Sequence, residues 1–65
     1  MNSEPDRLLL PQGEVRTLLG GISRTKVWEL VNAGELVRVN IGTRSFITAK
    51  SVAAYVDRLA AAASA

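Results

Sequence analysis

The stretch LLGGISRTKVWELVNAGEL, residues 18–36, decides the fold because it holds a complete helix with a signal at each end. Ser23 is a favoured N-cap residue, and Gly34 is the residue type that most often follows the last turn of a helix. The side chains between them place an apolar stripe on one face: Val27, Leu30 and Val31. We therefore expect an amphipathic helix over residues 24–33.

A second helix is expected just before it, over residues 11–19. Pro11 has the fixed φ of a first helical position. The face that this helix would bury carries Val15, Leu18 and Leu19. Gly20 and Gly21 supply the conformational freedom that ends the helix and turns the chain sharply. Two short helices joined by such a turn predict a helix-turn-helix.

Beyond these helices the apolar residues recur with a period of two, which is typical of strands. This pattern covers residues 36–41 and 46–48. Residues 42–45, Gly-Thr-Arg-Ser, then form the turn of a β-hairpin with Arg44 at its tip. Thr48 is a good N-cap for a last helix. The apolar stripe of that helix consists of Val52, Tyr55, Val56 and Leu59.

The chain of 65 residues has room for one small domain. We place it at residues 8–59, in the α+β class, as a small winged helix-turn-helix: the two helices, the hairpin as wing and a C-terminal helix. Residues 8–10 form a short extended entry. Polar residues 1–7 and alanine-rich residues 60–65 are expected to be a flexible tail and a fraying end. The expected core is Val15, Leu18, Leu19, Ile22, Val27, Leu30, Val31, Phe46, Val52, Val56 and Leu59.

Composition argues against several functional classes. The absence of cysteine and histidine argues against disulfides, the usual zinc sites and proton transfer by imidazole. The six acidic residues fall in the tail or on separate elements, which disfavours catalysis by paired carboxylates. We therefore expect that the protein is not an enzyme and that it binds no cofactor and no metal. With no long apolar run or signal-peptide pattern, we expect a soluble cytoplasmic protein without a membrane partner.

Positive charge is concentrated in the middle of the chain. The net charge is +2, but basic residues outnumber acidic ones only within residues 22–50. In a helix-turn-helix the second helix enters the major groove of DNA, and the positive end of its dipole faces a phosphate. The candidate DNA-binding residues on this helix are Ser23, Arg24, Thr25, Lys26, Trp28, Glu29 and Asn32. Those on the hairpin are Arg38, Asn40, Thr43 and Arg44.

The start of the second helix holds the main candidates. Cations there oppose the helix dipole, so Arg24 and Lys26 fit DNA contacts better than a merely solvated surface. Thr25 either touches a base edge or a thymine methyl group, or has no role. Glu29 either accepts a hydrogen bond from cytosine N4, pairs locally with Arg24 or Lys26, or is a solvated acid.

Trp28 and the polar residues of the hairpin are further candidates. Trp28 is expected to be partly core, with its ring at the edge of the helix pair and its indole N–H near a phosphate. Arg44 at the hairpin tip fits a minor groove. Arg38 and Asn40 either hold the DNA backbone beside it or protect an edge strand by charge and polarity.

Residues 8–56 resemble the excisionase/MerR-like winged-helix DNA-binding modules. The shared pattern includes LLG at 18–20, SRTKVW at 23–28, GEL at 34–36 and IG at 41–42, followed by an arginine-bearing wing and a capped final helix. The resemblance implies a phage excisionase, a recombination directionality factor that works in a bacterial host cell. Such a protein binds and bends attachment-site DNA as several cooperating copies and directs a tyrosine integrase toward excision.

Two other functions compete with this one. A small transcriptional repressor uses the same winged-helix fold, and the sequence does not separate it from an excisionase. A protein-interaction adaptor would need a more apolar outer face than Thr25, Lys26, Glu29 and Asn32 provide on the second helix.

Overall fold

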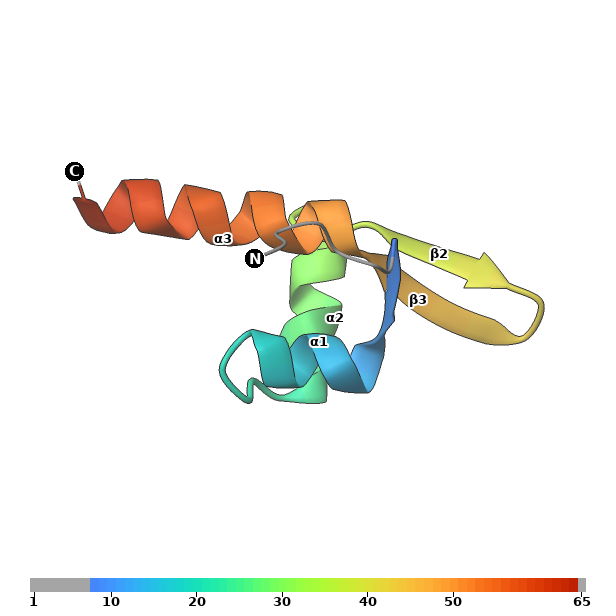
Figure 1. Ribbon diagram of the computed structural model, residues 1–65. Helices are drawn as coiled ribbons and strands as arrows, with labels where there is room; N and C mark the ends of the chain where they lie inside the picture. Colours follow the sequence, from blue (N-terminus) through green and yellow to red (C-terminus); the bar gives the residue numbers. More distant parts are fainter. Residues whose placement is uncertain (1–7, 65) are drawn as a thin grey trace, which may run out of the picture.

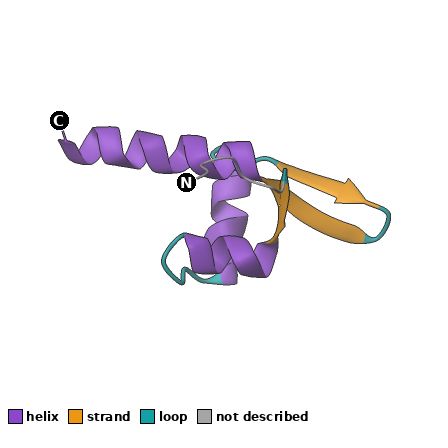
Figure 2. Cartoon of the chain, in the orientation of Figure 1, coloured by secondary structure: helices purple, strands orange, loops and turns teal. Residues whose placement is uncertain are grey.

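The computed structural model describes residues 8–64. In chain order its elements are β1 (Leu9–Pro11), α1 (Gln12–Leu18), α2 (Arg24–Asn32), β2 (Arg38–Ile41), β3 (Arg44–Thr48) and α3 (Ala49–Ser64), as Figure 1 shows. Within these residues the fold is α+β, with three helices and one three-stranded antiparallel sheet (Figure 2). The predicted tail at residues 1–7 lies outside the described residues.

Side chains cap α2 and α3 where the sequence predicts. The backbone N–H of Lys26 donates to Ser23 Oγ at 3.1 Å, and the backbone N–H of Ser51 donates to Thr48 Oγ1 at 3.2 Å. By contrast, Pro11 precedes α1 in extended backbone with no side-chain cap bond. The prediction that α1 begins at Pro11 is therefore wrong by one residue, because the proline completes β1 instead.

Glycines end α1 and α2 in the same way. The N–H of Gly34 donates to the carbonyl of Val31 at 3.1 Å, and the next N–H donates to Leu30 at 2.9 Å. The N–H groups of Gly20 and Gly21 make the equivalent pair of bonds at the end of α1. Gly20, Gly21 and Gly34 all have positive φ, which suits glycine and gives a Schellman end. Both predicted helix stops are confirmed.

The hairpin is tighter than predicted and gains a third strand. Only Gly42 and Thr43 form its turn, and Arg44 pairs with Ile41 at the start of β3. Gly42 has φ +61° while Thr43 has negative φ, the sign pattern of a type II′ turn. The extended entry is confirmed as β1, which pairs with the other edge of β3, giving the strand order β1-β3-β2.

The two faces of the sheet differ in burial. Directly paired residues project from the same face of a sheet. Leu10, Ile47 and Arg38 are paired across the three strands, and Leu10 and Ile47 are buried. We call this the inner face. The next pair along the hairpin, Val39 and Phe46, projects from the opposite, outer face and is only half-buried.

The core differs from the predicted one at both ends of the molecule. Its buried residues are Leu10, Val15, Val27, Leu30, Leu36, Ile47 and Val52. Leu18, Val56 and Leu59 were expected in the core but are 57%, 44% and 50% exposed. Leu18 is the last residue of α1, and Val56 and Leu59 follow Tyr55, which packs against the core. Their periodicity is helical, but the fold leaves each of them about half exposed.

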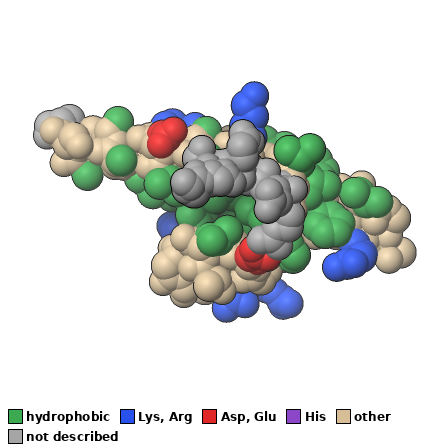
Figure 3. Space-filling view, viewed as in Figure 1, with side chains coloured by type: hydrophobic (Ala, Val, Ile, Leu, Met, Phe, Trp, Pro, Cys, Tyr) green, Lys and Arg blue, Asp and Glu red, His purple; other side chains and the backbone are tan. Residues whose placement is uncertain are grey.

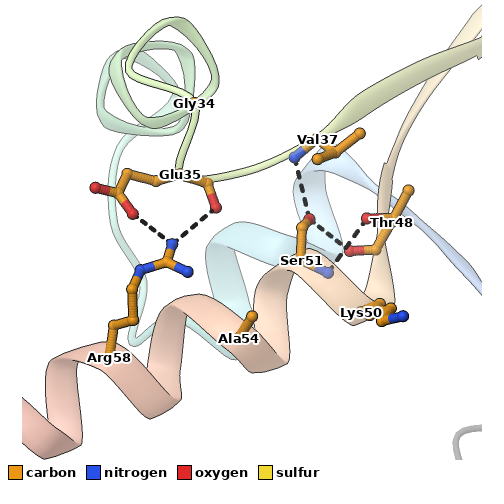
Figure 4. A pocket seen from close by; sticks show the side chains of 8 residues that line it. All are labelled: Gly34, Glu35, Val37, Thr48, Lys50, Ser51, Ala54 and Arg58. Carbon is orange, nitrogen blue, oxygen red and sulfur yellow. Dashed lines mark hydrogen bonds and ion pairs between the residues drawn. The ribbon is translucent and has the colours of Figure 1, made fainter.

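Two sets of polar contacts attach α3 to the connection between α2 and β2 (Figure 4). Ser51 Oγ donates to the carbonyl of Thr48 at 2.9 Å and accepts the N–H of Val37 at 3.1 Å. About two turns further along α3, Arg58 forms an ion pair with the carboxylate of Glu35. These contacts fix the direction in which α3 leaves the domain.

The outer part of α3 projects away from the other elements (Figure 1). The helix continues to Ser64, beyond the predicted domain end at residue 59, and residues 60–64 are helical and exposed. Alanine has the highest intrinsic helix propensity, which explains a helix here without packing. None of the helices in residues 8–64 combines the length and hydrophobicity of a transmembrane span.

Candidate nucleic-acid interface

The exposed face of α2 carries the predicted candidates. Val27 and Leu30 are buried against the core, so the opposite side of the helix points outward. The candidates on α2 that the structure leaves exposed are Arg24, Thr25, Lys26, Trp28, Glu29 and Asn32. Ser23 is exposed too, but its hydroxyl caps the helix. We therefore assign Ser23 to fixing the start of α2, where free backbone N–H groups point along the axis.

Trp28 connects α2 to the hairpin. Its ring lies beneath Arg38 of β2, with the guanidinium carbon 5.4 Å from the ring centroid, a contact that the sequence did not predict. The residue is 45% exposed. A guanidinium over an indole at this distance is a favourable cation–π contact. The exposed face of α2 and the inner face of the hairpin therefore meet at this pair.

Replacing Arg38 with alanine should expose Trp28 further and lower the free energy of unfolding by about 0.5–1 kcal/mol. Trp28 is the only tryptophan, so its fluorescence reports on this contact directly. We expect stronger acrylamide quenching and a red-shifted emission in Arg38→Ala. Arg44→Ala is the matched control, because Arg44 lies over Phe46 instead. Equal quenching of Arg38→Ala and the parent protein would contradict the contact.

The two arginines of the hairpin lie on opposite faces. Arg38 shares the inner face with Ile47, whereas Arg44 alternates with Ser45 and lies over the ring of Phe46 at 5.2 Å, on the outer face. The hairpin therefore does not direct both cations toward the same surface. Arg38 is on the side of α2, and Arg44 is next to the turn rather than at the tip, where the structure places Thr43.

Asn40 extends the inner face toward the turn. It pairs with Ser45, and Ser45 Oγ donates to Asn40 Oδ1 at 2.8 Å. An amide held in this way keeps its NH₂ group as a donor. Arg38 and Asn40 thus form one polar row on the inner face of the hairpin, and Arg38 is the member that contacts α2.

Glu29 pairs locally, one of the alternatives left open by the sequence. Lys26 Nζ lies 3.5 Å from Glu29 Oε1, and the two side chains are 55% and 61% exposed. Exposed pairs at this spacing contribute little and break readily. Lys26 therefore remains able to exchange this partner for a phosphate.

Arg16 of α1 is not among the residues predicted for the interface, but the structure places its side chain near the start of α2. Its side chain is exposed, and Nε donates to the carbonyl of Ile22 at 3.0 Å, just before the cap of α2. Its position near the start of α2 comes from the tertiary turn, so no spacing rule singles it out. Figure 3 shows Lys and Arg side chains along the lower edge of the molecule, below α1, and beside the hairpin.

The hollow in Figure 4 lies on the other side of the domain from the start of α2. It has a volume of about 280 Å³. Its walls come from the α2–β2 connection, β3 and α3: Gly34, Glu35, Val37, Thr48, Lys50, Ser51, Ala54 and Arg58. The bonds that attach α3 use several of these side chains, and none of the predicted DNA-binding residues lines the hollow.

Comparison of the chain with protein-family models, curated proteins and solved structures finds no match.

Proposed function

We propose that the chain is a winged-helix protein that binds double-stranded DNA sequence-specifically, with α2 as recognition helix and the β2–β3 hairpin as wing. The observation that carries the proposal is the meeting of α2 and the hairpin at Trp28 and Arg38. It joins an exposed polar helix face to a polar row on the hairpin. A basic surface that combines a helix with a neighbouring projection fits a duplex better than it fits a small molecule.

The dimensions of α2 support this docking. The helix has nine residues and is about 13.5 Å long at 1.5 Å per residue. An α-helix with its side chains is about 10–12 Å across and the major groove is about 12 Å wide, so α2 can lie in the groove. Its N-terminal cations then lie near base edges and phosphates, and Arg38 and Asn40 lie near the adjacent backbone.

Within this class we propose an excisionase that works in the cytoplasm of a bacterial host, on the strength of the resemblance of residues 8–56. One module of this size buries about 600–1,000 Å² of protein surface on DNA, which gives modest, salt-sensitive affinity. Several copies on adjacent direct repeats would bind more tightly and bend the duplex. The bent DNA would favour excision by a tyrosine integrase.

Two experiments in sequence test this proposal. Selection from a random duplex library, followed by gel-shift titration, should enrich a repeated site that the protein binds cooperatively and in preference to its scrambled version. An excision assay with a tyrosine integrase and attachment-site DNA that carries the selected repeat should then yield product only when this protein is present. Absence of sequence preference would contradict specific DNA binding. Specific binding with no effect on excision would contradict the recombination role and favour a repressor.

A further inference from the structure

We propose that Arg16 of α1 binds a DNA phosphate and so extends the interface across the turn between α1 and α2. This inference rests on the proposed DNA-binding function but concerns a residue and an element outside the predicted site. The carrying observation is the side-chain bond from Arg16 Nε to the carbonyl of Ile22.

This bond positions the guanidinium at the start of α2. Ile22 precedes the cap residue Ser23, and Arg24 is the first residue of α2. The Nε–H uses one of the five N–H donors of the group. The two Nη atoms carry the other four in a planar fork, which matches the geometry of phosphate oxygens.

Arg16 is also held by its backbone. Its carbonyl accepts the N–H of Gly21 at 2.7 Å in the Schellman end of α1, while its side chain bonds to Ile22. Both ends of the residue are thus attached to the same turn. A long side chain ordered before binding loses less conformational entropy when it meets a ligand.

The docking geometry of a helix-turn-helix gives this guanidinium a partner. The second helix enters the major groove, and the first helix crosses the phosphate backbone beside it. Arg16 belongs to the first helix and reaches to the beginning of the second. In this docking Arg16 faces the DNA phosphate backbone that borders the major groove, while Arg24 lies in the groove with α2.

The competing explanation is that Arg16 only stabilises the turn, and two substitutions separate the explanations. Arg16→Gln removes the charge, whereas Arg16→Lys keeps the charge without the Nε–H bond. A phosphate contact predicts that Arg16→Gln weakens binding about two- to fivefold. It also predicts that the slope of log affinity against log salt becomes less steep by about 0.9 in Arg16→Gln. Arg16→Lys, which keeps the charge, should have the parental slope.

The measurement is fluorescence anisotropy of the full chain on the selected duplex across a salt series, with the thermal midpoint of each variant. Lys50→Gln is the control, because it removes one exposed positive charge at the start of α3, away from α2's N-terminus, and should leave the slope unchanged. A parental slope in Arg16→Gln overturns the inference but leaves the proposed function intact. If Arg16→Gln and Arg16→Lys lower the thermal midpoint equally and both keep the parental salt slope, Arg16 only stabilises the turn. That result also overturns the inference. A parent chain without specific, salt-dependent binding overturns both proposals.

Discussion

Replacing Arg24 and Lys26 together with alanine should lower the affinity for target DNA by about 100-fold or more while the domain stays folded. Each lost base contact of a recognition helix costs about 1–3 kcal/mol, so the loss of two such contacts amounts to about 100-fold or more. Both side chains are exposed, and Lys26 has only a weak exposed pair with Glu29. Removing cations from a helix N-terminus also relieves their repulsion by the dipole. We therefore expect a thermal midpoint within a few degrees of the parent.

Gel-shift titration of the single and double variants on the selected site tests this expectation. Each single variant should bind more weakly than the parent and more tightly than the double variant. Lys50→Ala, which alters a cation at the other end of the domain, should bind like the parent. If the double variant also bound like the parent, α2 would not be the recognition helix.

Replacing Ile47 with alanine should destabilise the domain by about 2–5 kcal/mol. Ile47 is fully buried, and it is paired with Leu10 on one side and Arg38 on the other. At about 0.05–0.15 kcal/mol per residue, a domain of this length has little stability beyond that loss. The variant should therefore be largely unfolded at 37 °C, since the cavity lies where the sheet meets the helices.

Ile41→Ala is the matched control for this substitution. It makes the same chemical change in the same hairpin, but Ile41 is 59% exposed. We expect a loss of no more than about 0.5 kcal/mol. Urea unfolding followed by circular dichroism compares both variants with the parent. Similar losses at the two positions would refute the assignment of Ile47 to the core.

The elements that the sequence predicted well depend on local signals. The bounds of α2 follow from Ser23 and Gly34, whose contacts lie within a few residues of each. The capping of α3 by Thr48 is equally local. Such signals act before any tertiary structure exists, which is why they can be recognised along the chain.

The misplaced core residues depend on partners far along the chain. Phe46 and Ile47 are adjacent apolar residues, and pairing with β1 decides which of them faces the core. A shift of one residue in a strand exchanges its faces. Leu36 follows a helix end and is buried before β2 begins, although the strand pattern included it. Helical spacing likewise identified the face of α3 that carries Val56, but it did not show how far along the helix this face is packed.

The candidate site divides in the same way. Charge and helix position identified Arg24 and Lys26, and the structure leaves both exposed on α2. The contact between Trp28 and Arg38 and the bond from Arg16 to the turn are tertiary. These contacts join different parts of the fold, so the spacing of residues along the sequence does not predict them. The interface could be proposed from sequence, but its internal connections could not.

The pairing of β1 with β3 also sets an order of events in folding. Leu9 pairs with Thr48, so the first described strand finds its partner only after both intervening helices and β2 have left the ribosome. Closing this long loop is entropically costly, whereas the β2–β3 hairpin needs only a two-residue turn. We expect the hairpin to form first and β1 to join it late. Until β1 pairs with β3, the inner face of the sheet lacks Leu10 beside Ile47. The nascent chain therefore cannot fix β1 in place before β3 has been synthesised.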